Sequence, residues 1–408
     1  MLARYTMGDD TLDSVDVKAL VISRGVKVSS KVYRALGDRA RLSPDPLTCN
    51  AFLLPDDTVV QLTDLAFHMA YIRSAISWDM LQQVKYLNQL RTPFTLELSA
   101  ASTPVLKYNG QIVTEVRLPE PSAFYRQKTT SGMPYLGNAV LQGTEWVSFQ
   151  CLWACDYARA GMPCQYCYSG GVFDSLTRKK KPLPPFPTPA DAAEIAAYAI
   201  TQEQCARSIQ ITGGSTFDPA AEVDRIVEYL GAITEAVGRE RIAGEIVVYM
   251  TPPRDPGLID AVFAAGADRV SCSLEIWDEN LARIIMPGKS KYNERQQHLA
   301  MLEYAAAKYG PGKACSNFIV GLEPVESCLA GAEYLASRGV VPIASVWIPF
   351  GRPVMGSMQA PDLGYYRAIK AGFAGIHRKY GIEPPGGSGL NVCIDKDIFA
   401  HRDAILAG

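Results

Sequence analysis

Cys151-Leu-Trp-Ala-Cys155-Asp-Tyr-Ala-Arg-Ala-Gly-Met-Pro-Cys164-Gln-Tyr-Cys167-Tyr168 is the most informative stretch of this 408-residue chain. Four of the ten cysteines fall within it, with the spacing C-x3-C-x8-C-x2-C. Thiolates at this density bind a metal ion, form disulfides or hold an iron–sulfur cluster. The six cysteines elsewhere are interpreted as small apolar core residues, because cysteine is among the most buried residue types.

Composition narrows these choices. Hydrophobic residues make up 48% of the chain, charged residues 20%, and the formal net charge is −2, so nucleic acid is not an expected partner. No window offers about 18 uninterrupted apolar residues, and we expect no membrane span. The N-terminus lacks a basic region followed by an apolar run, which argues against a signal peptide. We therefore expect a cytoplasmic protein, whose reducing compartment favours a metal or cluster over disulfides.

Six short apolar strands alternate with helices from residue 145 onward. We expect them at residues 146–150, 208–212, 245–250, 269–275, 315–321 and 343–350. This alternation is typical of a parallel sheet built from right-handed crossovers, an α/β fold whose chemistry lies at the carboxyl ends of the strands. The cysteine stretch directly follows the first of these strands.

Other segments carry local signals. Two hairpins are predicted, one at 51–62 and one at 105–118, where Asn109-Gly110 forms the turn. Residues 119–142 are rich in Pro, Gly and Ser and are interpreted as a linker, and residues 279–308 as one long helical segment.

Three further motifs have both a chemical and a structural interpretation. Gly213-Gly214-Ser215 ends the second strand, where it either lets a ligand approach the backbone or forms a simple turn. Ser273 and Glu275 share one face of the fourth strand, and a carboxylate there either faces solvent or serves a site. Arg295 follows in a polar run, where a single arginine is more often a solvated surface charge.

Taken together and in this order, the motifs resemble the radical S-adenosylmethionine (SAM) superfamily over roughly residues 141–360. The stretch from Leu274 to Arg295, with Pro287-Gly288-Lys289-Ser290 inside it, is particularly similar to biotin synthase and to the related hydrogenase-maturation and pyrrolysine-biosynthesis enzymes. The resemblance implies a partial (β/α)6 TIM-like barrel at 141–360. It would follow an N-terminal α+β domain of unknown role at 1–140 and precede a short C-terminal helical extension at 361–408.

The resemblance also implies roles for single residues. Cys164 and Cys167 match the last two ligands of a 4Fe-4S cluster. The SAM contacts would come from eight residues: Tyr166 and Ile319 at the adenine, Gly213, Gly214 and Ser215 at the methionine amino group, Glu275 with Ser273 at the ribose or amino group, and Arg295 at the methionine carboxylate. The family usually has Glu where this chain has Ser215.

The cysteine spacing departs from the family pattern. That pattern is C-x3-C-x2-C, and its first cysteine would fall at residue 160, which is alanine here. The first ligand is then Cys155 or Cys151, and we favour Cys155 because Cys151 directly continues a strand. The catalytic subunit of the elongator complex is similar, with an enlarged first spacing and an extra upstream cysteine that is not a ligand.

The function implied by the resemblance is reductive cleavage of SAM at the cluster. The resulting deoxyadenosyl radical would abstract hydrogen from a small-molecule substrate in cofactor or metabolite biosynthesis, with an electron donor such as flavodoxin or ferredoxin. No residue is assigned a catalytic role. The run Arg178-Lys179-Lys180-Lys181 either holds an acidic substrate or is a solvated loop. The alternative to the whole interpretation is a structural zinc site of four cysteines, or an interaction module built on one, on an α/β scaffold.

Overall fold

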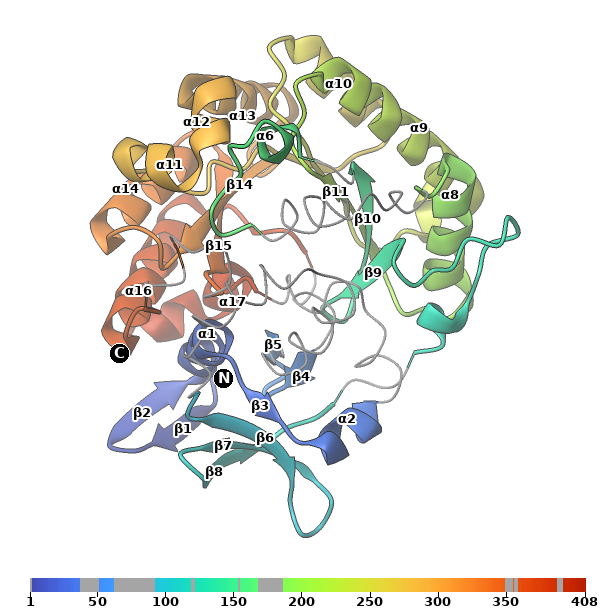
Figure 1. The fold of residues 1–408 in the computed structure, drawn as a ribbon. Helices are drawn as coiled ribbons and strands as arrows, with labels where there is room; N and C mark the ends of the chain where they lie inside the picture. Colours follow the sequence, from blue (N-terminus) through green and yellow to red (C-terminus); the bar gives the residue numbers. More distant parts are fainter. Residues whose placement is uncertain are drawn as a thin grey trace.

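The computed structural model describes residues 2–36, 51–61, 92–118, 122–152, 155–167, 186–348, 355, 359–386 and 392–408. Its centre is a curled sheet of the order β15-β14-β13-β12-β11-β10-β9 (Figure 1). The strands are β9 (Ala139–Gln142), β10 (Trp146–Leu152), β11 (Ser208–Gly213), β12 (Ile246–Tyr249), β13 (Arg269–Ser271), β14 (Ala314–Val320) and β15 (Val340–Val346). Strands β10 to β15 are parallel, and β9 is antiparallel to β10. The six predicted strands and the α/β partial barrel are confirmed, and β9 adds an antiparallel edge.

Helices cover the convex side of this sheet (Figure 1). They are α8 (Pro189–Ala197), α9 (Pro219–Val237), α10 (Pro256–Ala264), α13 (Arg295–Tyr309), α14 (Val325–Ala336) and α16 (Leu363–Tyr380). A π-helical turn, η3 (Tyr198–Gln202), extends α8, and a 3-10 turn, η4 (Arg239–Arg241), follows α9. Phe149, Ile211 and Val248 point toward the helices and belong to the main apolar core. Their neighbours along each strand therefore face the concave side.

Helix starts follow the local sequence. Thr188 caps α8 by accepting a hydrogen bond from the backbone N–H of Asp191, whose side chain returns the contact. The pairs Asp218-Pro219 and Asp255-Pro256 open α9 and α10 in the same manner, with the carboxylate as cap and proline at the first helical position.

The prediction of one helix over residues 279–308 is wrong. The segment forms α11 (Glu279–Ile285), α12 (Pro287–Tyr292) and α13. Pro287 lacks an N–H and disfavours helical backbone at Met286, whose ψ is 58°. Asn293, with φ −126° and ψ 91°, ends α12. The two breaks turn α12 toward the sheet's carboxyl edge.

The linker predicted at 119–142 is also wrong over its described residues, 122–142. Phe124 and Tyr125 in the 3-10 turn η2 (Phe124–Arg126) are buried, as is Tyr135. The Phe124 and Tyr135 rings lie 5.2 Å apart, and both approach Tyr198. Aromatic burial overrides the Pro, Gly and Ser content here, and the segment ends in β9 of the central sheet.

The N-terminal third contains small sheets and two described helices. Its elements are β1 (Arg4–Met7), β2 (Asp10–Asp13), α1 (Ser14–Arg24), β3 (Lys27–Val28), α2 (Ser30–Leu36), β4 (Ala51–Leu53), β5 (Val59–Gln61), β6 (Phe94–Leu98), β7 (Pro104–Tyr108) and β8 (Gln111–Glu115). Both predicted hairpins are confirmed, β4–β5 and β7–β8, and Asn109 and Gly110 have φ values of 48° and 82° in the second turn.

The two ends of the chain pack together (Figure 1). Lys370 on α16 contacts Asp13 and Asp16, each at 2.5 Å, and Lys18 on α1 pairs at 2.7 Å with Asp397 on α17 (Asp395–Leu406). Within the described ranges, no helix has both the length and the apolar character that crossing a membrane requires.

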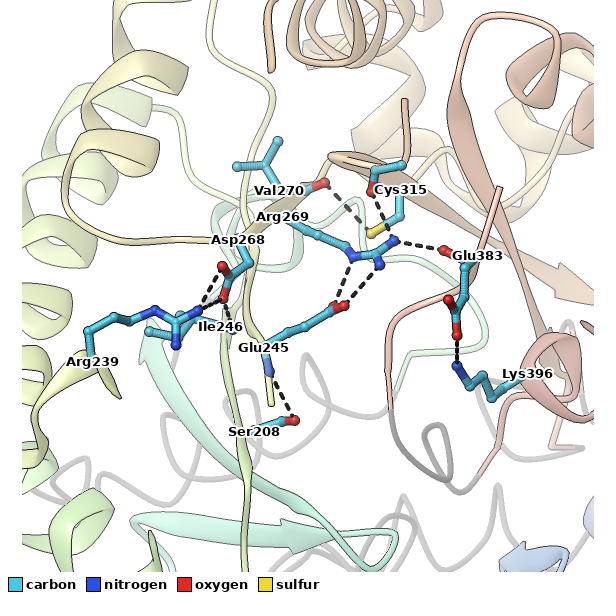
Figure 2. A network of polar contacts seen from close by, with 11 residues as sticks. Ser208, Arg239, Glu245, Ile246, Asp268, Arg269, Val270, Cys315, Glu383 and Lys396 are labelled. Atoms are coloured by element: carbon cyan, nitrogen blue, oxygen red, sulfur yellow. Dashed lines mark hydrogen bonds and ion pairs between the residues drawn. The ribbon is translucent and has the colours of Figure 1, made fainter. Parts of the chain in front are cut away.

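A charged network closes the amino-terminal edge of the sheet (Figure 2). Arg269, the first residue of β13, donates to both carboxylate oxygens of Glu245, at 2.8 and 2.9 Å. Its other donor binds the carbonyls of Gly312 and Glu383, at 2.9 and 2.8 Å. This network ties strand starts to the C-terminal segment, at the opposite edge from the site described next.

Candidate functional site

A cavity of about 330 Å³ lies on the concave side of the sheet, toward the carboxyl ends of the strands. Five of the residues singled out from the sequence line it: Gly213, Gly214, Ser215, Ser273 and Glu275. They come from the ends of β11 and β13, two strands that flank β12 in the sheet. The topology therefore brings together motifs that are far apart in the chain.

The cysteine segment follows β10 at this same edge. Cys155, Cys164 and Cys167 are each partly exposed. Cys151, in contrast, is 0% exposed and packs in the main core, on the helix-facing side of β10 with Phe149. Burial raises the pKa of both the Cys151 and the Cys164 thiols, so the pKa does not distinguish the two. The structure separates Cys151 from the other three cysteines by the face of β10 on which it packs.

Asp156 fastens the cysteine segment to the Gly-Gly turn. Its backbone N–H donates to the Ser215 carbonyl at 2.8 Å, and its carboxylate accepts from the Thr216 hydroxyl at 3.0 Å and the Phe217 N–H at 2.9 Å. A side chain at Gly213 would place its Cβ only 3.0 Å from Leu152. Glycine is required there because β10 and β11 approach so closely.

Glu275 is held by two residues from other elements. Lys289 on α12 donates to its carboxylate at 2.7 Å and to the Ser273 carbonyl at 2.9 Å, and the Tyr166 hydroxyl donates to the same carboxylate. Glu275 has a φ of 69°, a conformation that non-glycine residues rarely adopt and that concentrates at functional sites. Burial alone would lower the pKa of Lys289, but Glu275 raises it above its ordinary value.

Tyr166 and Cys164 pack beside Ile319 in a small apolar cluster that is centred on Met286 and Trp347. The Tyr166 hydroxyl also lies 3.6 Å from the Met286 sulfur. Ile319 comes from β14, whose backbone pairs with Glu275 through Ile319 N–H to Glu275 O at 2.9 Å. Tyr166, Ile319 and Cys164 thus all pack against the same buried apolar cluster.

Arg295 is not among the residues that line the cavity. Its guanidinium lies 3.5 Å from the centre of the Trp277 ring, donates to the Trp277 carbonyl at 2.9 Å and pairs with Glu279 at 3.4 Å. The cation that lines the cavity in the described part of the chain is Lys289.

Sequence reasoning missed Lys289 and four polar residues of the concave wall: Gln210, Glu222, His298 and Asn317. A signal for this wall was present in the strands. Strands covered on both faces are nearly continuous apolar runs, yet residues 148–150 and 208–212 alternate polar with apolar side chains. That alternation indicates a polar interior. The basic run at 178–181 lies outside the described residues.

The cysteine set can be tested against the two metal groups. Across the described ranges, no three His, Cys, Asp or Glu side chains lie close enough to chelate one ion, as a zinc site would require. A 4Fe-4S cluster places each thiolate on a different iron, so its ligands need not converge on one point. Three partly exposed thiols on one short segment, at the edge of the sheet where the cavity lies, fit such a cluster.

Comparisons with known proteins agree. Residues 155–326 match the family model described as the radical SAM superfamily. Bacteriochlorophyllide c C-7(1)-hydroxylase from Chlorobaculum limnaeum is 25% identical over 301 residues, which cover 71% of this chain and 74% of that protein.

Among solved structures, methylornithine synthase has a TM-score of 0.44 at 13% identity, covering 64% of this chain and 69% of that one. The coproporphyrinogen III oxidase of Escherichia coli, a radical SAM enzyme, has a TM-score of 0.33 at 15% identity, and the match spans about half of each chain, 49% and 48%.

The family match begins at Cys155 and includes the Gly-Gly turn, Glu275 and Lys289, so it covers the site just described. It does not favour the zinc alternative. Residues 155–326 match the radical SAM superfamily, which supports an enzyme that uses a 4Fe-4S cluster and S-adenosylmethionine.

Proposed function

We propose that this enzyme holds its cluster through Cys155, Cys164 and Cys167, cleaves SAM reductively, and removes a hydrogen atom from a small-molecule substrate in the concave cavity. The cluster and SAM supply the reducing electron and the hydrogen-abstracting group. The observation that carries the proposal is the position of the three partly exposed cysteines, whose segment is fastened through Asp156 to the glycine turn of that cavity.

The ligand assignment rests on the two faces of β10. The backbone pairing of β10 with β11 shifts register between Gln150 and Leu152, so Cys151 lies at a bulge. Its carbonyl accepts from Arg225 at 3.3 Å, and its side chain lies among the core residues under the helices. Reaching the cavity edge would require β10 to rotate. Cys155 lies beyond the strand, at the start of α6 (Asp156–Arg159), where no such constraint applies.

The SAM-binding residues follow from the same geometry. Gly213, Gly214 and Ser215 present backbone groups close to the ligand, and Glu275, held by Lys289, presents a carboxylate that is already oriented before SAM binds. Ser273 is its companion just after β13, and Tyr166 and Ile319 provide the apolar surface for adenine. Arg295 would reach the methionine carboxylate only by leaving Trp277 and Glu279, so we assign it the outermost contact.

The protein surroundings matter as much as the ligands. The curled sheet lines one side of the cavity, where it shields the reacting atoms from water and unrelated hydrogen donors. Radical SAM chemistry needs a reductant, and we propose flavodoxin or ferredoxin as the donor. We also propose three regions: residues 1–140 as an N-terminal α+β domain, 141–360 as the catalytic partial barrel and 361–408 as a C-terminal extension.

Anaerobic reconstitution tests the proposal. Iron and sulfide content, the visible spectrum and deoxyadenosine release from SAM with dithionite are measured for the native protein and for Cys155→Ala and Cys151→Ala. We expect a brown protein with about four irons, and loss of the cluster only in Cys155→Ala. A colourless protein with one zinc contradicts the function, and cluster loss only in Cys151→Ala contradicts the assignment.

A further inference from the structure

The wall of the cavity beyond Glu275 and Lys289 is polar. On the concave face of β11, the Gln210 side-chain carbonyl accepts from Gln142 at 3.0 Å and from Ser148 at 2.5 Å, which joins three neighbouring strands. Barrel interiors that serve only as cores are filled by branched apolar residues. The row of amides and hydroxyls here is hydrogen-bonded within itself, and it offers a polar surface to a ligand.

Glu222 belongs to this wall and contacts Thr251. It lies in the first turn of α9, is 2% exposed, and accepts the Thr251 N–H through Oε2 at 3.1 Å. The Thr251 side chain also interacts with the Glu222 carboxyl group. Burial raises the pKa of Glu222 to about 8, so at neutral pH it is largely a neutral acid that can donate through Oε1.

Two further lining residues carry buried polar atoms that no described group satisfies, Oδ1 of Asn317 and Nε2 of His298. His298 is 3% exposed, and burial lowers its pKa to about 3, so it is uncharged. A buried polar atom without a partner costs roughly 1–3 kcal/mol. Polar groups brought by a ligand would remove that cost.

The charges of the cavity cancel. Among its described lining residues, Glu275 and Lys289 neutralise each other at 2.7 Å, and Glu222 and His298 are uncharged at neutral pH. Among these described residues, an anionic ligand would find no uncommitted cation, and an apolar ligand would leave Asn317 Oδ1 and His298 Nε2 unpaired.

We propose that this wall binds the substrate of the reaction as an uncharged polar molecule with amide, carbonyl or hydroxyl groups, which Glu222 holds as a neutral hydrogen-bond donor and Asn317 through its amide. The inference rests on the proposed function for the identity of the ligand as substrate. It assigns substrate recognition to two residues on α9 and β14, outside the cysteine segment and the glycine turn.

Three probes of nearly the same shape test this: acetamide, acetone and acetate. Saturation-transfer difference NMR with the unlabelled probes measures their binding to the SAM-loaded holoenzyme. In a second experiment the methyl groups of the probes are deuterated, and deuterium transfer into deoxyadenosine measures whether the bound methyl group reaches the reacting atoms. We expect acetamide to exceed both others in each readout, because acetone cannot donate and acetate carries a charge.

Variants distinguish the roles. Glu222→Leu and Asn317→Leu should each weaken acetamide binding about fivefold, which corresponds to about 1 kcal/mol. Glu222→Gln should bind as the native enzyme does, since glutamine also offers a carbonyl to Thr251 and a donor to the cavity. Gln61→Leu is the matched control, because Gln61 is a buried amide in β5, outside the cavity.

The inference would be overturned if the three probes bound equally well, or if the Glu222→Gln variant bound acetamide as weakly as Glu222→Leu does. Absence of deoxyadenosine in every sample instead counts against the proposed function, and the NMR measurement still decides the binding claim.

Discussion

Replacing Lys289 with methionine removes the cation from the Glu275 site at nearly constant side-chain length. The side chains of Lys289 and Glu275 are only 13% and 18% exposed. Removing one partner of a buried pair costs about 3–5 kcal/mol because the other charge remains uncompensated. Since both groups keep some contact with solvent, and Tyr166 still donates to Glu275, we expect the free energy of unfolding to fall by about 3 kcal/mol.

Urea unfolding of the cluster-free protein at pH 7 measures this, with Glu275→Gln and the double variant completing a mutant cycle. The double variant leaves no unpaired charge. Its loss of unfolding free energy should therefore be about 2 kcal/mol smaller than the sum of the losses in the two single variants. Lys291→Met is the control, because Lys291 is exposed on the same helix. In reconstituted protein, Lys289→Met should also weaken SAM binding, since Glu275 is no longer held in place.

The pH dependence has a definite sign. The folded pKa of Lys289 is raised above its ordinary value of 10.5, so its contribution is fully present below pH 10.5 and is lost as pH rises through the folded pKa. The stability difference between native and Lys289→Met protein should therefore be constant from about pH 7 to 9 and shrink above pH 10.5. This role of the Lys289–Glu275 pair would be refuted if the free energy of unfolding of Lys289→Met lay within about 0.5 kcal/mol of the native value at pH 7. It would also be refuted if the losses in the two single variants added up to the loss in the double variant.

Three further outcomes are expected. Burial raises the pKa of Asp395 from 3.8 to about 7, so the folded state holds an extra proton between these pH values and native stability declines as pH rises through them. The Asp395→Asn variant lacks this titration. In thermal unfolding, the free energy of unfolding of the variant should therefore rise relative to that of native protein by up to about 1.4 kcal/mol per pH unit over that range. Gly213→Ala should lower the iron retained after desalting, because its Cβ would meet Leu152 at 3.0 Å and displace the cysteine segment. Arg269→Met should lower the free energy of unfolding by about 3 kcal/mol in urea while SAM affinity stays unchanged, since it breaks the pair with Glu245 at the far edge of the sheet.

The parts of the fold that could be predicted depend on neighbours in sequence. Asn109 and Gly110 form their hairpin because both accept positive φ, and Thr188 caps its helix through a residue three positions away. Strand alternation in the sequence also singles out Ser273 and Glu275, and both line the cavity, although β13 ends at Ser271 and Glu275 has a φ of 69°.

The parts that could not be predicted depend on partners that are distant in sequence. Glu275 gains Lys289 because the breaks at Met286 and Asn293 turn α12 toward the sheet; Pro287 signals the first break, but no local pattern indicates that α12 then meets Glu275. Phe124 similarly owes its burial to Tyr135 and Tyr198, which no local pattern indicates.

The same reasoning explains the long spacing between Cys155 and Cys164. The residues between them form α6 and a turn that packs on α12: the Gly288 N–H donates to the Met162 carbonyl at 3.1 Å, and the Tyr157 ring stacks 5.8 Å from Tyr292. A Cβ at Gly288 would lie 2.5 Å from that of Tyr157, so the helix and the segment fit only without a side chain there. Because α12 also carries Lys289, the inserted residues connect the cysteine segment to the group that orients Glu275. The enlarged spacing is therefore a packed structural element, and shortening it to the family pattern should loosen Lys289 as well as the cysteines.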